Sequence, residues 1–77
     1  MNVEQCRSAR ALLNWSAAEL ATAAGIGSAT VRRYESGQIV QQGSIATMRV
    51  ALEQAGIVFI NSGETSKRAG FGVRLAT

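Results

Sequence analysis

The chain has 77 residues, of which 47% are hydrophobic, and its formal net charge is +3. This length predicts one small domain, because a chain of this size buries only about 60% of its unfolded surface. The sequence has no histidine, no aspartate and one cysteine, and its five glutamates are scattered. These features exclude an internal disulfide and a zinc site of clustered Cys and His ligands. They also argue against an enzyme, since acid–base catalysis mostly uses His or paired carboxylates.

The charge and the apolar pattern limit the partners and the compartment. A surplus of positive charge favours an anionic partner, although a net charge of three also serves simply to keep a small domain soluble. No apolar run is long enough to cross a bilayer, and the start of the chain has no signal-peptide pattern. We interpret Cys6 as a small buried apolar residue, which suits a reducing cytoplasm. We therefore expect a cytoplasmic protein that binds no metal, no cofactor and no membrane.

The first predicted helix spans residues 3–13. Asn2 and, three residues later, Gln5 form a capping box, which is typical of a helix N-terminus. Asn14 is expected to end this helix. Trp15 follows at the corner, and we interpret it as a core anchor in preference to an indole that stacks on a base.

Two short helices are predicted next, over residues 16–24 and 28–35. Ser16 and Glu19 form a second capping box, and Gly25 ends the first of the two helices because glycine adopts the left-handed conformation without steric cost. The second carries polar and basic residues on its outward side: Ser28, Ala29, Arg32 and Arg33. Two short helices of this kind, joined by a tight turn, are typical of the helix-turn-helix arrangement.

The fourth predicted helix spans residues 44–55, after a loop over residues 38–43. Ser44 is expected to cap this helix and Gly56 to end it. The pattern then changes to that of strands, over about residues 57–61 and 71–75.

We predict that these two strands form a C-terminal β-hairpin with a long mobile loop that contains Lys67 and Arg68. A two-stranded ribbon is only marginally stable alone, so it must pack on the helices or pair with another subunit. Its free edge is also open to strand addition by a partner.

Taken together, these residues resemble the Cro/C1-type helix-turn-helix family of repressors, also called the XRE family. The resemblance rests on five segments in order: Arg10-x-x-Leu13, WSAAELA at 15–21, AGI at 24–26, Thr30-Val31 and YESG at 34–37. It implies a mainly α fold, with a four-helix Cro/C1-like helix-turn-helix domain and a C-terminal β-hairpin. This single domain would cover residues 1–77.

The resemblance also implies which residues touch DNA, since the third helix of the family enters the major groove. Base contacts would then come from Ser28, Ala29, Thr30, Arg32 and Arg33, and the arginine fork matches O6 and N7 of guanine. Phosphate contacts would come from Arg10, Ala17 and Gly27. Gln41 and Gln42 are further candidates, which a solvated loop explains equally well. Arg10 also corresponds to a family position that pairs with an acid, here Glu35, and a purely structural ion pair is an equally good interpretation.

Two departures from the family pattern leave two functions open. Ala17 stands where a glutamine usually holds a phosphate, and Gly27 stands where a Ser or Thr usually caps the third helix. The first function is a transcriptional regulator that binds operator DNA as a homodimer. The alternative is an XRE-like antiactivator, a protein-binding module that has lost DNA binding and sequesters a transcriptional activator such as a quorum-sensing regulator. Its partner surface would involve the hairpin residues Ile57, Phe59, Val73 and Leu75.

Overall fold

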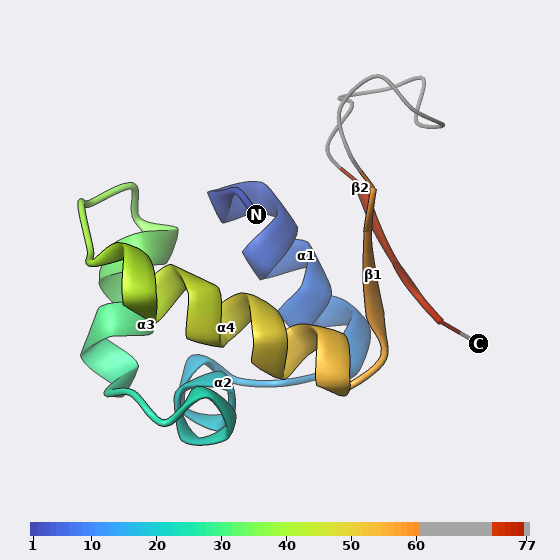
Figure 1. Cartoon of the computed structure of the whole chain (residues 1–77), viewed down its shortest axis with the longest axis horizontal. Coiled ribbons are helices and arrows are strands. Elements are labelled where there is room, and N and C mark those ends of the chain that lie inside the picture. The colour runs from blue at the N-terminus through green and yellow to red at the C-terminus, as the bar shows by residue number, and fades with distance from the viewer. Residues whose placement is uncertain (61–71, 77) are drawn as a thin grey trace.

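The computed structural model describes residues 1–60 and 72–76, which form four helices and a two-stranded hairpin (Figure 1). The helices are α1 (Val3–Leu13), α2 (Ala17–Ala24), α3 (Ser28–Glu35) and α4 (Gln42–Gln54), and the strands are β1 (Ile57–Ile60) and β2 (Gly72–Leu75). The predicted mainly α fold with a C-terminal β-hairpin is confirmed. The predicted loop with Lys67 and Arg68 lies outside the described residues.

Local hydrogen bonds define where the first two helices begin, and both predicted capping boxes form. Asn2 Oδ1 accepts from the Gln5 N–H at 2.8 Å, and Gln5 Oε1 accepts from the Asn2 N–H at 3.0 Å. Ser16 and Glu19 exchange the same two bonds, at 3.0 and 2.7 Å. Gly25 ends α2 with φ of +72°, in the left-handed region that glycine adopts freely.

The start of α4 differs from the prediction. The helix begins at Gln42, and its N-cap residue is Gln41, which makes no side-chain capping bond. Ser44 therefore lies inside the first turn, and the prediction that it caps the helix is wrong. The Gln41 carbonyl already accepts from the N–H groups of Ser44 and Ile45, at 3.0 and 3.3 Å, so the helical ladder starts before Ser44. The loop is accordingly two residues shorter than predicted.

Every helix contributes to one buried cluster, which holds α3 in place. The largest fully buried side chains are those of Cys6 from α1, Leu20 from α2, Val31 from α3, and Met48 and Leu52 from α4. Trp15 is only partly buried and packs against the edge of this cluster. The predicted core anchor thus lies at the rim of the core and not within it.

The hairpin packs against the helices, as expected for a ribbon of only two strands. Its strands are antiparallel, with Phe59 opposite Val73. The Gln5 amide of α1 donates from Nε2 to the carbonyl oxygens of Ile60 and Gly72, at 3.1 and 3.3 Å, and so ties both strands to that helix. The Arg49 guanidinium of α4 lies 4.8 Å from the centre of the Phe59 ring.

Candidate nucleic-acid interface

The turn between α2 and α3 presents one face of α3 to solvent. Gly25 ends α2, and the Ile26 N–H donates to the Ala21 carbonyl at 3.0 Å, which directs the chain into the turn. Val31 and Tyr34 are both buried, so the inner side of α3 is anchored in the core. In Figure 1, α3 lies at one edge of the molecule, next to the loop that leads into α4. The opposite side of α3 is consequently free to meet a partner.

That outward face is positively charged, and none of the described acids pairs with it. Ala29, Arg32 and Arg33 are exposed, while Ser28 and Thr30 are half-buried. Within the described residues, neither arginine side chain forms an ion pair or a hydrogen bond. The face therefore presents two unengaged guanidinium groups, each with five N–H donors.

A shallow hollow between α3 and the start of α4 brings several predicted DNA-contact residues together. It is lined by Thr30, Arg33, Ile39, Val40, Gln41 and Ser44. Two predicted base-contact residues, Thr30 and Arg33, thus lie beside the predicted phosphate-contact residue Gln41. Ile39 is 99% exposed, and sequence reasoning missed it, because nothing in the sequence distinguishes a buried loop isoleucine from an exposed one.

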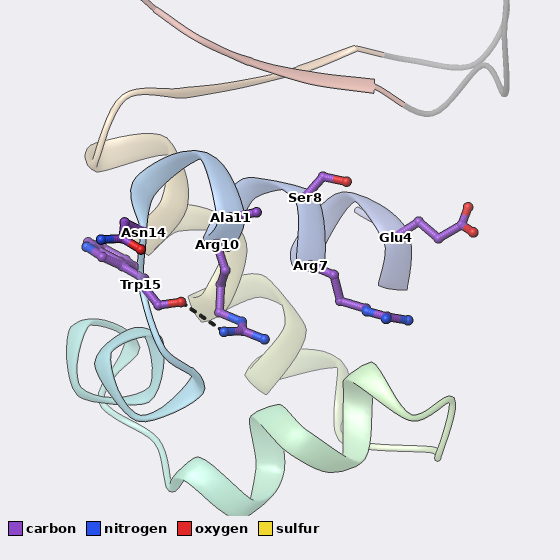
Figure 2. A pocket seen from close by; sticks show the side chains of 7 residues that line it. All are labelled: Glu4, Arg7, Ser8, Arg10, Ala11, Asn14 and Trp15. Carbon is purple, nitrogen blue, oxygen red and sulfur yellow. Dashed lines mark hydrogen bonds between the residues drawn. The ribbon is translucent and has the colours of Figure 1, made fainter.

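The predicted pair of Arg10 and Glu35 forms and joins α1 to the end of α3. Arg10 Nε lies 2.8 Å from Glu35 Oε2, and Nη2 lies 2.7 Å from Oε1, so the contact is bidentate. Arg10 Nη1 also donates to the Trp15 carbonyl at 2.9 Å, the bond drawn in Figure 2. The side chains of Arg10 and Glu35 are 22% and 11% exposed. Three of the five N–H donors of Arg10 are thus engaged within the chain.

A thiol completes this network. Cys6 Sγ lies 3.4 Å from Glu35 Oε2, and burial, together with the charge of that carboxylate, raises the pKa of the Cys6 thiol to about 12. Burial alone would raise the pKa of Glu35, but hydrogen bonds from Arg10 and Cys6, and the charges of Arg10 and Arg7, outweigh it and lower that pKa. Cys6 is therefore a protonated donor as well as the buried residue that was expected. Its partner is 29 residues away, so no local pattern signals the contact.

The residues that line a hollow along α1 do not form a catalytic site. Figure 2 shows its lining residues, which are Glu4, Arg7, Ser8, Arg10, Ala11, Asn14 and Trp15. Arg7 and Arg10 extend from the side of α1 that faces α3. A single serine and a single carboxylate, without a base between them, do not form an activated nucleophile. In the part of the chain that the structure describes, no three His, Cys, Asp or Glu side chains lie together as metal ligands would.

The two positions that depart from the family pattern offer backbone only. Ala17 is the first residue of α2 and is half-buried. The side chains of Ser16, before it, and Glu19, after it, each accept a hydrogen bond from the other residue's main-chain N–H. Gly27 is the N-cap residue of α3 and makes no side-chain bond. Any hold on phosphate at these points comes from main-chain N–H groups.

The hairpin residues predicted to bind a partner mostly serve the chain's own packing. Ile57 is buried, and Phe59 and Val73 pack against the core cluster, whereas Leu75 is exposed. Their side chains lie on the face of the hairpin that covers α1 and α4. A protein partner would therefore meet the strand edges and the outward face before these side chains.

The described elements have the architecture of a helix-turn-helix domain: two short helices, a glycine turn, and an outward basic face on the second helix. The sequence profile of the family described as "Helix-turn-helix" matches residues 7–46, which is more than half of the chain. The chain therefore belongs to this family, the XRE type of helix-turn-helix protein, and the resemblance drawn from the sequence is confirmed. The family consists of DNA-binding transcription regulators and not of enzymes.

A search of the curated proteins finds no match to the chain. None of the described helices has both the length and the apolar character needed to cross a membrane.

Proposed function

We propose that this protein is a transcription regulator that binds operator DNA with α3 in the major groove, as a homodimer. The observation that carries the proposal is the pair Arg32 and Arg33, exposed on the outward face of α3 and without an acidic partner among the described residues. An arginine fork donates two hydrogen bonds to O6 and N7 of guanine, which is the commonest specific contact in the major groove.

The surroundings of α3 support this placement. A helix with its side chains is about 10–12 Å in diameter, which fits the roughly 12 Å width of the major groove. α2 and α4 both begin near α3, since Arg10 joins Trp15, just before α2, to Glu35, and Gln41, just before α4, shares a hollow with Arg33. At the start of α2 the Ser16 side chain engages the Glu19 N–H, and at the start of α4 the N-cap residue makes no side-chain bond. Main-chain N–H groups at helix N-termini are good phosphate ligands. We infer that these two helix starts hold the DNA backbone on either side of the recognition helix.

The single recognition helix among the described residues favours two copies on one site. That helix is α3, whereas a palindromic operator has two half-sites about 34 Å apart along one face of B-DNA. One copy therefore reads one half-site, and a palindromic operator requires two copies whose α3 helices lie one helical turn apart.

Titration of fluorescent duplexes tests this function. The affinities of the wild type and of two variants are measured for the same duplexes. These duplexes are selected from a random library or taken from the promoters of the protein's own and neighbouring genes. Arg33→Ala removes a base contact and lowers affinity for the selected site about 5- to 150-fold, because such a contact contributes about 1–3 kcal/mol. Arg74→Ala is the matched control, since it removes an equal charge from the exposed part of β2 and changes affinity less than twofold.

Salt dependence completes the test. Affinity falls steeply as salt rises, since neutralised phosphates release counterions. Binding that ignores salt, or equal effects of the two substitutions, contradicts the proposal.

A second candidate function is a protein-binding module that sequesters a transcription activator. It is favoured by the missing side-chain grip at Ala17 and by a shallow, largely apolar groove between α2 and α4. That groove is lined by Ala23, Ala24, Ala46, Thr47, Val50, Ala51 and Gln54. An NMR titration with generic duplex DNA at low salt separates the two functions. Shifted amides at Ser28, Arg32 and Arg33 support the regulator, and an unchanged spectrum supports the protein-binding module.

A further inference from the structure

Ile39 has the most exposed large apolar side chain in the described part of the chain. It is 99% exposed, whereas Val50, the next in order, is 50% exposed. The turn that carries Ile39 is held by hydrogen bonds to α3: the Gly37 N–H donates to the Tyr34 carbonyl and the Gln38 N–H to the Arg33 carbonyl, both at 3.0 Å. The isoleucine therefore projects into solvent from a backbone whose position follows that of the recognition helix.

The neighbours of Ile39 suggest what it meets. It shares its hollow with Thr30 and Arg33 of α3 and with Gln41, whereas the following residue, Val40, packs against the core. The isoleucine thus lies beside a basic side chain that the proposed function places against a base. A partner that covers Ile39 must also accommodate the Arg33 cation.

We propose that Ile39 is a specificity-determining residue that contacts the 5-methyl group of a thymine next to the guanine bound by Arg33. This inference rests on the proposed DNA binding. The thymine methyl is the apolar group that base edges offer in the major groove, and an isoleucine side chain has no donor or acceptor for any other edge. DNA provides a partner for both side chains, since guanine offers acceptors to Arg33 and thymine offers a methyl group to Ile39. An apolar protein surface would satisfy Ile39 and leave the Arg33 cation buried without a partner.

The remaining exposed surface of α3 is consistent with a readout of G and T. It carries no Asn or Gln, which read adenine, and its acid, Glu35, is engaged by Arg10 and does not read cytosine. Each half-site is therefore expected to contain a thymine adjacent to a guanine.

Parallel selections from a random duplex library test the proposal. The wild type, Ile39→Ser and the control Val50→Ser are each used to enrich duplexes with a randomised stretch of about 20 base pairs. The wild type and the control enrich half-sites with thymine beside guanine. The Ile39 variant keeps the guanine and loses the preference for thymine. Because Ile39 is fully exposed, its variant unfolds at the wild-type temperature, which circular dichroism verifies.

Removal of one methyl group from the DNA makes the test specific. Deoxyuridine at the selected thymine removes only the methyl group, and wild-type affinity then falls about fourfold, the effect of burying one such group. The Ile39→Ser variant binds both duplexes equally.

Four results contradict the proposal in distinguishable ways. Wild-type binding that is indifferent to uracil, or an undiminished thymine preference in the variant, overturns the role of Ile39 and leaves DNA binding intact. Loss of the guanine preference together with the thymine preference overturns it as well, because Ile39 would then support the loop and not read a base. If the wild type enriches no duplex, both this inference and the proposed function fail.

Discussion

The carboxylate of Glu35 stabilises the position of the recognition helix, and Glu35→Gln measures its contribution. In the folded chain it accepts two charge-assisted hydrogen bonds from Arg10 and one from Cys6, and its side chain is only 11% exposed. Glu53→Gln is the matched control. Glu53 pairs with Arg49 at 3.1 Å one helical turn away, and both side chains are more than 40% exposed. The same chemical change is thus made once in a largely buried network and once on the surface.

The two environments predict different losses of stability. Hydrogen bonds to charged groups contribute about 1.5–3 kcal/mol, and an amide cannot accept from both ends of the Arg10 fork, so Glu35→Gln lowers the free energy of unfolding by about 2 kcal/mol. An exposed pair at i,i+4 contributes about 0.3–0.5 kcal/mol. In a domain of this size each kcal/mol corresponds to roughly 4–8 °C in Tm, which predicts a decrease of about 8–16 °C for Glu35→Gln and of no more than about 2–4 °C for Glu53→Gln.

The stabilisation by Glu35 also has a defined pH dependence. Its pKa in the folded chain lies below the ordinary value of 4.5, because the Arg10 and Cys6 hydrogen bonds outweigh the effect of burial. The contribution is therefore complete above pH 4.5 and is lost as the pH falls through the lower folded pKa. The difference in stability between the wild type and Glu35→Gln consequently narrows on acidification below pH 4.5.

Thermal and urea unfolding, followed by far-UV circular dichroism between pH 3 and pH 7, measures both effects. A loss of less than about 0.5 kcal/mol for Glu35→Gln would place this pair among ordinary surface ion pairs and refute the reasoning. A stability difference that stays constant on acidification would equally refute it.

Further predictions concern the turn and the thiol. Gly25→Ala destabilises the chain by about 1–2 kcal/mol, because φ is +72° although the added Cβ meets no atom within 4 Å. Gly43→Ala is the control, since Gly43 lies inside α4 with equal space and without a positive φ, and this change does not lower stability. Gly27→Ser adds a side-chain cap to α3 and raises the Tm by a small amount, worth a few tenths of a kcal/mol. Burial raises the pKa of Cys6 from 9.0 to about 12, so stability that is complete below pH 9 falls as the pH rises above it. In Cys6→Ala this alkaline loss is smaller, and an unchanged alkaline profile would contradict its assignment to the thiol.

The sequence predicted the helix-turn-helix correctly because its signals act over three or four residues. The capping boxes at Asn2 and Ser16 and the stop at Gly25 depend on neighbouring backbone groups alone. The same local reasoning was wrong about Ser44, because a cap requires extended backbone at the cap residue, and here the first such residue before the helix is Gln41. Local preference favoured Ser44, the better capping residue, over Gln41 three positions earlier.

The exposure of the residues proposed to bind a partner depended more strongly on contacts between distant parts of the chain. Arg32 and Arg33 were predicted to lie on the outward side of their helix, and both are exposed. The hairpin side chain of Ile57 was expected to be available to a partner, yet it is buried because the strand folds back onto the helices.

The helices, their ends and the outward arginines of α3 were thus encoded in short segments of sequence, where hydrogen bonds join residues three or four positions apart. The tertiary packing determined the rest. It engaged three donors of Arg10 with Glu35 and Trp15, made Cys6 a hydrogen-bond donor, and left Ile39 in solvent beside Arg33. These properties arise from contacts between separate elements, and the burial of a side chain depends on which elements fold over it.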